Sequence, residues 1–448
     1  MSVWKSAVAD GRWEQDMEEF IRTLTEQIRC IKARDAVARE IENHIMDQAE
    51  HFEAEGMDPE RAQREAVAQM GDPVSIGVEL DHIHRPRTDW DMVCMVIGFS
   101  IGGVIIQYLM GALSEPWMLW RQCICTGIGL ILMAGIYYLD YSFIGNHAKE
   151  LYASAVLLCI LSILMMPEVN GMHRGMIMPM YLFVPLYGGI LYQYRGQGYG
   201  GVVKSIAFLL IPVYIGWRGI PSVATAFHLC VICGCMLLIA IGGGWFLVNK
   251  VKMVVTMMIT GIILPAIFGA FAWFFLMADY QKMRLQAFLN PSFFASDAGY
   301  IYGWVRRMLA GSRFIGRTAE EVDHLAGSDF LLMELVVTYG SFFGILVVVA
   351  LILRAFHISA MQKNRLGFMI GTGIGLVFLL LVVEGIGVNF TILPATTVTL
   401  PFLTVGGTAT FVYDILIGLL LAIYRYKNIL GERAYKARWK IGVRMEKL

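Results

Sequence analysis

Charge is scarce in this 448-residue sequence, because Asp, Glu, Lys and Arg together make up only 16% of its residues. Hydrophobic residues reach 57%, with 46 glycines and 27 methionines, and the mean hydropathy is +0.60. A soluble protein of this size needs more charge at its surface, and a disordered chain contains fewer apolar residues. The composition therefore excludes both classes and predicts an integral membrane protein.

The first 90 residues lack any long apolar segment, so we expect no cleavable signal peptide and a start in the cytoplasm. They hold 11 basic and 20 acidic residues, a net charge of −9, which the rest of the chain balances with +9. Much of that basic excess follows Tyr424, beside the last apolar segment. Such a tail predicts a cytoplasmic anchor on anionic membrane lipids. No folded basic face accompanies it, so we expect no nucleic-acid partner.

The eight cysteines do not form the pattern of a disulfide framework, since seven of them lie in apolar segments. Cys230, Cys233 and Cys235 follow His228 closely, a spacing that also occurs in metal sites. In an apolar helix, small polarizable packing residues are the favoured interpretation.

Residues 1–90 are predicted to form a small cytoplasmic domain of amphipathic helices. Two stripes of apolar residues have helical spacing, and Asp58-Pro59 and Asp72-Pro73 combine an N-cap with proline at the first helical position. The stretch ending in "AVAQMGDPVSIGVEL" resembles the permease prefix domain found ahead of some Gram-positive membrane proteins. We expect a solvated bundle without chemistry of its own. The stripes are Phe20, Leu24, Ile28 and Ile31, then Val37, Ile41, Ile45 and Phe52, with Gly56 and Gly71 as helix ends.

The remaining chain predicts an all-α, polytopic membrane domain over residues 91–427. A bilayer core of about 30 Å needs roughly 20 apolar residues per helix. An even number of spans returns the basic tail, residues 428–448, to the cytoplasm, and lysines and arginines in the short inner loops agree with the positive-inside rule. The ten predicted spans are 92–112, 117–139, 150–167, 176–194, 200–218, 221–247, 252–278, 330–353, 366–388 and 399–424.

One connection, residues 279–329, is much longer than the others and lies on the outer side in this topology. It mixes arginines and carboxylates with tyrosine and tryptophan. Loops of this length inside compact folds are usually functional or disordered. The internal stretch "AGYIYGWVRRMLAGS" predicts an interfacial helix, and we take this loop as the site of chemistry.

Several stretches, in the same order along the chain, resemble the SEDS family (shape, elongation, division and sporulation), the group that contains FtsW, RodA and SpoVE. "LPATTVTLPFLTVGGT" at 393–408 is similar to that family's Leu-Pro-x-x-Gly-x-x-Leu-Pro-Phe-x-Ser-x-Gly-Gly-Ser. "RLQAFLNP" at 284–291, "AGYIYGWVRRMLAGSRFIG" and "GSDFLLMELVVTYG" match three further segments, and "GMHR" and "IPSVATA" match two more faintly. The resemblance covers roughly residues 91–427.

The sequence departs from the family pattern at several charged positions. Pro179-Met180-Tyr181 stands where the family has Pro-Ser-Glu, and Ser222 replaces the Asp of Pro-Asp-x-Gly-Thr. Leu325 stands where the family has Glu in Leu-Pro-Glu. These departures indicate a divergent member.

Members of this family polymerise glycan strands from lipid-linked disaccharide, so the resemblance implies a peptidoglycan glycosyltransferase acting on lipid II-type substrate at the outer face. Asp329 matches the family's catalytic Asp and would act as general base. From the residues alone, Ser328-Asp329 before an apolar helix favours helix capping. The resemblance favours catalysis.

The departing diphosphate needs positive charge, and arginine presents planar donors suited to phosphate oxygens. The candidates for this role are Arg284, Arg306, Arg307 and Arg313, with Arg284 on a family position; binding to lipid headgroups or pairing with loop carboxylates is the alternative. Glu321 falls on an acidic family position and is a further substrate-binding candidate; a solvated loop charge is the alternative. Gly406 and Gly407 are expected either to shape a substrate groove or to pack helices closely.

Three carboxylates lie in or at the ends of spans, where charge is costly. Glu334 is expected to face the same cavity as Asp329. For Glu384 and Asp414, a structural polar contact within the bundle is the favoured interpretation.

Two other functions stay open, a flippase or transporter of a lipid-linked precursor and an inactive scaffold for cell-wall enzymes. The absence of an internal repeat and the collection of charge in one loop favour surface chemistry over transport. The resemblance implies a class B penicillin-binding protein as partner. A divalent cation such as Mg or Mn at the diphosphate would be chemically reasonable, but no ligand cluster in the sequence specifies one.

Overall fold

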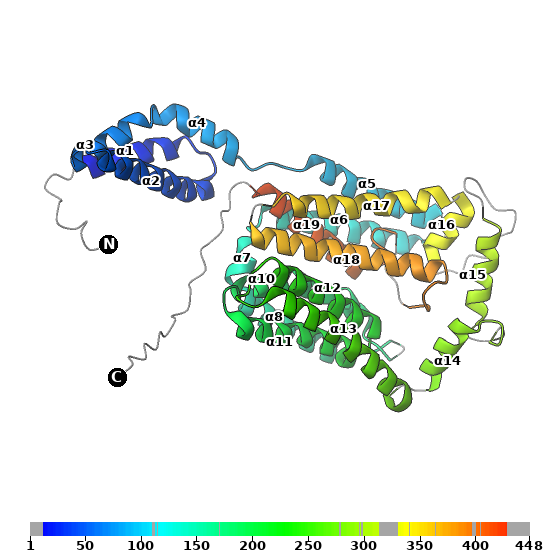
Figure 1. Cartoon of the computed structure of the whole chain (residues 1–448). Coiled ribbons are helices and arrows are strands. Elements are labelled where there is room, and N and C mark those ends of the chain that lie inside the picture. Colours follow the sequence, from blue (N-terminus) through cyan, green and yellow to red (C-terminus); the bar gives the residue numbers. More distant parts are fainter. Residues whose placement is uncertain are drawn as a thin grey trace, which may run out of the picture. The chain divides into compact units, whose positions relative to one another are not determined.

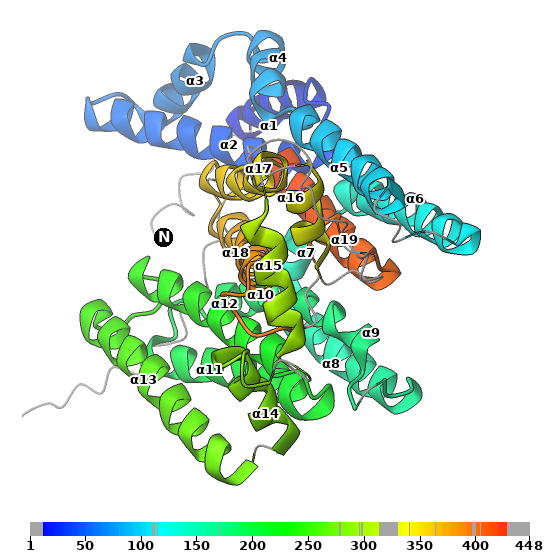
Figure 2. The same cartoon turned by 90° about the vertical axis from the view of Figure 1, so that its right-hand side faces the viewer.

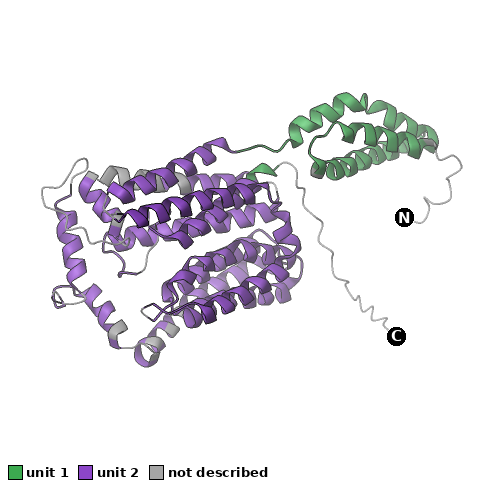
Figure 3. Cartoon of the chain, turned by 180° about the vertical axis from the view of Figure 1, so that it is seen from behind, with its two compact units in different colours: residues 1–88, 424–433 green, residues 89–423, 434–448 purple. Residues whose placement is uncertain are grey.

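The computed structural model describes residues 12–109, 113, 115–169, 171–276, 279–294, 296, 299–312, 330–339, 341–362, 364–396, 400–403 and 405–427. Apart from one isolated bridge between Val169 and Met172, the regular structure of these residues is helical, as predicted. The chain divides into two compact units (Figure 3). Unit 1 comprises residues 1–88 and 424–433, and unit 2 comprises residues 89–423 and 434–448.

Unit 1 contains four helices, α1 (Arg12–Glu26), α2 (Ile31–Ala54), α3 (Pro59–Gln69) and α4 (Pro73–His84). The apolar stripes of α1 and α2 meet in a small core, because α1 packs on α2 and α4 while α2 packs on α3. Its fully buried side chains include Leu24, Ile28, Val37, Ile45, Ala62 and Ala66.

The starts of α3 and α4 confirm the Asp-Pro signals, since Asp58 and Asp72 are the N-caps and each precedes a proline at the first helical position. The Asp72 carboxylate accepts hydrogen bonds from the Ser75 hydroxyl at 2.6 Å and the Ser75 backbone N–H at 3.0 Å. These bonds, that from the hydroxyl first, lower the pKa of the Asp72 carboxyl below its ordinary value.

One detail of the first stripe was wrong. Helix α1 ends at Glu26, so Ile31 does not extend its apolar face but opens α2, where 76% of it is exposed. Ile28 lies in the intervening turn and is still fully buried. Gly56 and Gly71, predicted as helix ends, have φ of 96° and 87°, a left-handed conformation that glycine adopts without steric cost.

Unit 2 supplies the membrane spans. Eight segments in its described part are long and apolar enough to cross a membrane, and they match eight of the ten predicted spans within a few residues at most ends. The sixth is shorter than predicted, because the chain turns at Gly243-Gly244. The segments are α5 (Trp90–Leu109), α6 (Pro116–Tyr138), α8 (Ala148–Met165), α9 with η2 and α10 (Arg174–Gln193), α11 with η3 (Gly198–Gly219), α12 (Val223–Gly242), α18 (Arg365–Asn389) and α19 (Gly407–Arg425).

The other two predicted spans also coincide with helices. The seventh is α13 (Lys250–Phe271), continued by the π-helical turn η4 (Ala272–Leu276). The eighth comprises two helices, α16 (Leu331–Tyr339) and α17 (Ser341–Ala360). Ten spans therefore remain the prediction for the whole chain, with helices described at every one of the ten places.

Helix α18 lies at the centre of unit 2, in contact with α10 (Phe183–Gln193), α12, α16 and α17. Glycines allow this close packing. A Cβ at Gly373 would lie 2.8 Å from Val184 Cγ1 and 2.9 Å from Met236 Cε, and one at Gly371 would lie 2.5 Å from Ser359 Oγ. Small residues at helix contacts let backbones approach in membrane bundles.

The long connection after the seventh span contains two helices, α14 (Asp279–Leu289) and α15 (Tyr300–Ala310). The helix predicted from "AGYIYGWVRRMLAGS" is thus confirmed. In Figures 1 and 2, α15 lies beside α16 at the end of unit 2 where α18 terminates. We call this the α15 end of the bundle.

Candidate functional site

A cavity of about 510 Å³ opens at the α15 end, between α15 and the turn that follows α14. Among the described residues of its lining, Arg306 and Arg307 carry charge, and both side chains are exposed. The described lining comprises Pro291, Ser292, Gly299, Tyr300, Gly303, Arg306 and Arg307. This described lining is therefore basic, with hydroxyl groups from Ser292 and Tyr300.

Two glycines shape this cavity in different ways. Gly299 closes the turn against α15: its backbone N–H donates to Phe294 O at 3.0 Å, and a Cβ there would lie 2.5 Å from Pro291 O. No larger residue fits that close approach. Gly303, one turn into α15, would point a Cβ into open space. A longer side chain at position 303 would therefore fill the cavity.

Helix α15 is amphipathic, which explains why its arginines reach the cavity. Trp304 and Val305 are buried against Met333 and Val337 of α16, while Arg306 and Arg307 follow on the exposed side. The apolar face thus fixes the helix, and the opposite face presents the guanidinium groups.

Phe330 joins two apolar clusters at the start of α16. It packs against the cluster that includes Trp304 of α15 and against a second that includes Val388 of α18 and Leu400. The chain therefore enters α16 at a point fixed by both α15 and α18.

The segment after α18 ties the same elements together with hydrogen bonds. Ala395 N donates to Tyr302 Oη at 3.0 Å, and Arg306 Nε donates to Thr391 Oγ1 at 3.2 Å. Asn389 Oδ1 accepts from Met333 N, in the first turn of α16, at 2.9 Å. Residues 389–395 therefore contact α15, which lines the cavity, and α16, on which α15 packs.

Among the described residues, no carboxylate pairs with Arg306 or Arg307. Two guanidinium groups that no described carboxylate neutralises attract an anion, and their planar donors suit phosphate oxygens best. The cavity is thus chemically suited to a phosphate or diphosphate group.

The predicted site residues fall in several places. Arg313, Glu321 and Asp329 lie outside the described residues. Arg284 is exposed on α14 and is not part of the cavity lining. Glu334 is buried in α16, also outside the lining.

Gly406 and Gly407 lie away from the cavity, at the start of α19. Gly406 N donates to Gln122 Oε1 of α6 at 3.3 Å, and a Cβ at Gly407 would lie 2.9 Å from Cys125 Sγ. In the described structure Gly407 lets α19 approach α6 closely, whereas a Cβ at Gly406 would meet only Ala409 Cβ, at 3.9 Å. A part in a substrate groove stays a prediction for both.

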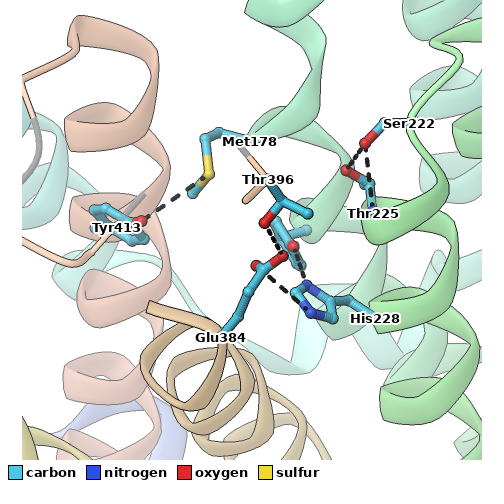
Figure 4. A network of polar contacts seen from close by, with 8 residues as sticks. Met178, Ser222, Thr225, His228, Glu384, Thr396 and Tyr413 are labelled. Atoms are coloured by element: carbon cyan, nitrogen blue, oxygen red, sulfur yellow. Dashed lines mark hydrogen bonds and ion pairs between the residues drawn. The ribbon is translucent and has the colours of Figure 1, made fainter. Parts of the chain in front are cut away.

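A second polar cluster lies inside the bundle (Figure 4). Glu384 of α18 has its Oε2 3.6 Å from His228 Nε2 of α12, and its Oε1 accepts from Thr396 Oγ1 at 2.9 Å. Tyr181 Oη and His228 Nδ1 lie 2.7 Å apart in a hydrogen bond. The structural polar contact predicted for Glu384 is confirmed, and Tyr181 and His228 are members of the cluster that the sequence did not identify.

For Asp414 the corresponding prediction was wrong within the described structure. Its side chain is fully buried in α19, and neither carboxylate oxygen has a hydrogen-bond partner there. The reason is its neighbour: Asp414 Oδ2 faces Gly129 of α6, which has no side chain to donate a hydrogen bond.

The described residues contain no group of three or more His, Cys, Asp and Glu side chains that could hold a metal ion. All eight cysteines are free, and Cys233 is buried in α12. A resident metal site is thus not formed by this part of the chain, and a divalent cation carried with the diphosphate stays a prediction.

Fold and site together define a polytopic, all-helical membrane protein with a basic cavity at one end of its bundle. The chain belongs to the FtsW/RodA/SpoVE family of cell cycle proteins, because residues 199–429, just over half of it, match that family.

Two curated relatives have similar sequences. The peptidoglycan glycosyltransferase MrdB of Escherichia coli (strain K12) is 29% identical over 184 residues, which is 38% of this chain and 49% of MrdB. The chain thus spans about half the length of this relative. The probable peptidoglycan glycosyltransferase FtsW of Hydrogenovibrio crunogenus is 24% identical over 373 residues, or 75% of this chain and 91% of that protein.

Two solved structures share the fold. A chain from a peptidoglycan synthase complex that coordinates polymerization and crosslinking has a TM-score of 0.62 and 20% identity, covering 75% of this chain and 98% of that one. The Thermus thermophilus rod shape determining protein RodA has a TM-score of 0.53 and 17% identity, covering 76% and 97%.

Proposed function

We propose that this protein is a peptidoglycan glycosyltransferase that polymerises lipid-linked disaccharide of the lipid II type. The observation that carries the proposal is the cavity bearing Arg306 and Arg307, at the end of the bundle reached by the long connection. The names of the relatives MrdB and FtsW support the same activity.

In this reaction a sugar hydroxyl oxygen attacks the anomeric carbon of the donor. The bond between that carbon and the lipid diphosphate breaks, and the diphosphate leaves with the bonding electron pair. Arg306 and Arg307 hold the diphosphate and stabilise the negative charge that develops on it. Because the two arginines are already in place in the folded protein, they need not reorient as charge develops on the diphosphate. Preorganised charges of this kind stabilise a transition state effectively.

The hydroxyl proton must go to a base, and Asp329 is our candidate from its place in the family motif. Phe330, the next residue, packs against clusters from α15 and α18, so the backbone after Asp329 is anchored at the α15 end. Arg313 and Glu321 belong to the same connection and are proposed to complete substrate binding.

The proposed orientation places both termini in the cytoplasm and the α15 end at the outer face. The lipid-linked disaccharide then reaches the cavity from the outer leaflet, with its lipid tail among membrane lipids. A class B penicillin-binding protein is the proposed partner, and the similarity to a chain of a peptidoglycan synthase complex supports it.

Purified full-length chain incubated with fluorescent lipid-linked disaccharide tests the proposal. We expect glycan polymer from the wild type and none from Asp329→Asn. Asp323→Asn is the matched control, because it removes a carboxylate from the same connection without touching the family motif, and it should retain polymerisation. Polymer from Asp329→Asn would exclude Asp329 as the base.

The same assay separates the alternative functions. No polymer from the wild type, with or without a class B penicillin-binding protein, would favour an inactive scaffold. Movement of labelled substrate across vesicles without polymer would favour a flippase. Either result would overturn the proposed enzyme.

A further inference from the structure

Helix α18 ends in a regular Schellman motif with an unusual residue. Ile392 N donates to Gly387 O at 2.7 Å and Thr391 N donates to Val388 O at 3.1 Å, the two bonds that define this helix end. Thr391 occupies the position after the C-cap, with φ of 55°. Glycine, or less often asparagine, normally stands there.

Threonine is a poor choice for this backbone conformation. A Cβ in the left-handed region approaches the following carbonyl, and a β-branched residue adds a second heavy atom to the crowding. A residue keeps such a strained backbone conformation only when many surrounding contacts fix it, and strained residues of this kind concentrate at functional sites. The sequence thus retains a side chain where glycine would suit the backbone better.

The turn does not need the Thr391 hydroxyl for its own support. Besides the two Schellman bonds, Asn389 joins it to α16 through Met333 N, and Ala395 N joins the following segment to Tyr302 of α15. The hydroxyl has a different partner, Arg306 Nε, at 3.2 Å. Thr391 is 7% exposed, so this hydrogen bond is shielded from water on the threonine side.

The consequence for Arg306 concerns its geometry. A guanidinium group carries five N–H donors in one plane. Binding Nε to a fixed hydroxyl orients that plane and leaves the terminal Nη donors for a ligand in the cavity, which Arg306 lines. A long flexible side chain held in this way loses less conformational freedom when it binds an anion.

We propose that Thr391 is a positioning residue, retained in a strained helix end because its hydroxyl orients Arg306 toward the diphosphate of the substrate. The inference rests on the proposed function for the identity of the substrate. The hydrogen bond between Thr391 and Arg306, and the cavity that Arg306 lines, do not depend on the proposed function.

Three substitutions separate the hydroxyl from the backbone. Thr391→Ser keeps the hydroxyl. Thr391→Val keeps the branched shape but lacks the hydroxyl. Thr391→Gly lacks the hydroxyl and also relieves the backbone strain. We expect Val and Gly both to weaken binding of inorganic diphosphate to the full-length chain about tenfold, as loss of one oriented charged contact does, while Ser stays near wild type. Arg306→Ala should weaken binding at least as much as Thr391→Val does, and adding Thr391→Val to Arg306→Ala should weaken it little further.

Enzyme kinetics and thermal unfolding together distinguish a positioning role from a purely structural one, because only a positioning role separates the loss of activity from the loss of stability. Val and Gly should both lower kcat/KM for lipid-linked disaccharide about tenfold, although Gly should unfold at the wild-type temperature or above and Val at or below it. If kcat/KM instead follows stability, with Gly like wild type and Val impaired, Thr391 serves the backbone only and the proposal is overturned.

Failure of the proposed function is recognised separately. If the wild type makes no polymer but diphosphate binding still follows the hydroxyl, Thr391 positions Arg306 for another phosphate ligand and only the enzyme is rejected. If the wild type does not bind diphosphate, or if all three variants bind it equally, the positioning role is rejected whatever the activity.

Discussion

His228 Nε2 lies 3.6 Å from Glu384 Oε2, so a contact between two buried polar side chains joins α12 to α18 inside an apolar bundle. The two residues are 156 positions apart in the chain. Thr396 and Tyr181 complete the cluster with bonds to its two ends. The cluster therefore anchors α18 and the segment that follows it, which in turn contacts the candidate site.

Removing Glu384 should be costly, because buried His228 Nε2 would lose its carboxylate partner and half-buried Thr396 would lose its acceptor. We expect Glu384→Leu to destabilise the protein by about 1–3 kcal/mol, whereas Glu384→Gln keeps an acceptor for Thr396 and should cost less. Asp414→Leu is the control: it removes a buried carboxylate without a described partner and should leave stability equal or higher. Thermal unfolding of the full chain in detergent measures all three, and equal losses for both Leu variants would contradict the account.

Arg354 of α17 forms a polar link with the buried carboxylate of Asp89 at the start of α5. Its Nε donates to Asp89 Oδ2 at 3.1 Å, while Asp91 lies at 3.4 Å with an exposed side chain. Asp89 is 3% exposed and also accepts from Met92 N at the start of α5. Asp89→Ala should therefore destabilise the protein by about 3 kcal/mol and Asp91→Ala by less than about 1 kcal/mol. Chemical denaturation distinguishes them, and comparable effects would show that the pair is effectively solvent-exposed.

Filling the cavity should separate activity from stability. Gly303→Leu adds a side chain where open space lies, so we expect turnover at low substrate concentration to fall about tenfold or more. Gly303→Ala is the matched control, since it adds a single methyl group and improves helix propensity by up to about 1 kcal/mol. Wild-type kinetics for the Leu variant would remove the cavity from the mechanism.

The cap of α4 gives a pH dependence. The pKa of Asp72 is lowered in the folded protein, so its contribution to stability is present above the unfolded value, near 3.8, and disappears as pH falls through the lower folded value. Hydrogen exchange of the α4 amides in the full chain should thus be faster in Asp72→Ala than in wild type at pH 6, and the difference should shrink below pH of about 4. A difference that is constant with pH would mean that the charge of Asp72 is irrelevant.

The local features of the fold could be predicted because they depend on neighbouring residues. Asp72-Pro73 marks the start of α4 by capping chemistry alone, and the helix at Tyr300–Ala310 follows from the spacing of its apolar residues. Ile31 shows the limit of this approach. The apolar residues keep helical spacing up to Ile31, although α1 ends at Glu26 and Ile31 belongs to the next helix.

The contacts that build the site could not be predicted, because they join distant parts of the chain. Nothing near Arg306 in the sequence indicates that its partner is Thr391, and nothing near Glu384 identifies His228. The left-handed Thr391 is equally hidden, since threonine there looks like an ordinary loop residue until α18 is seen to end in a Schellman motif. Only packing of the helices determines these pairs.

The most direct test of the account asks where the substrate diphosphate binds. A lipid-linked disaccharide with a photoreactive group beside its diphosphate can be crosslinked to the full-length chain in detergent and the labelled peptides mapped by mass spectrometry. We predict labelling of the peptides that contain Ser292, Tyr300 and Arg307, and loss of this labelling on competition with unlabelled substrate. Competed labelling confined to α10 and α12, with none at the α15 end, would contradict the account.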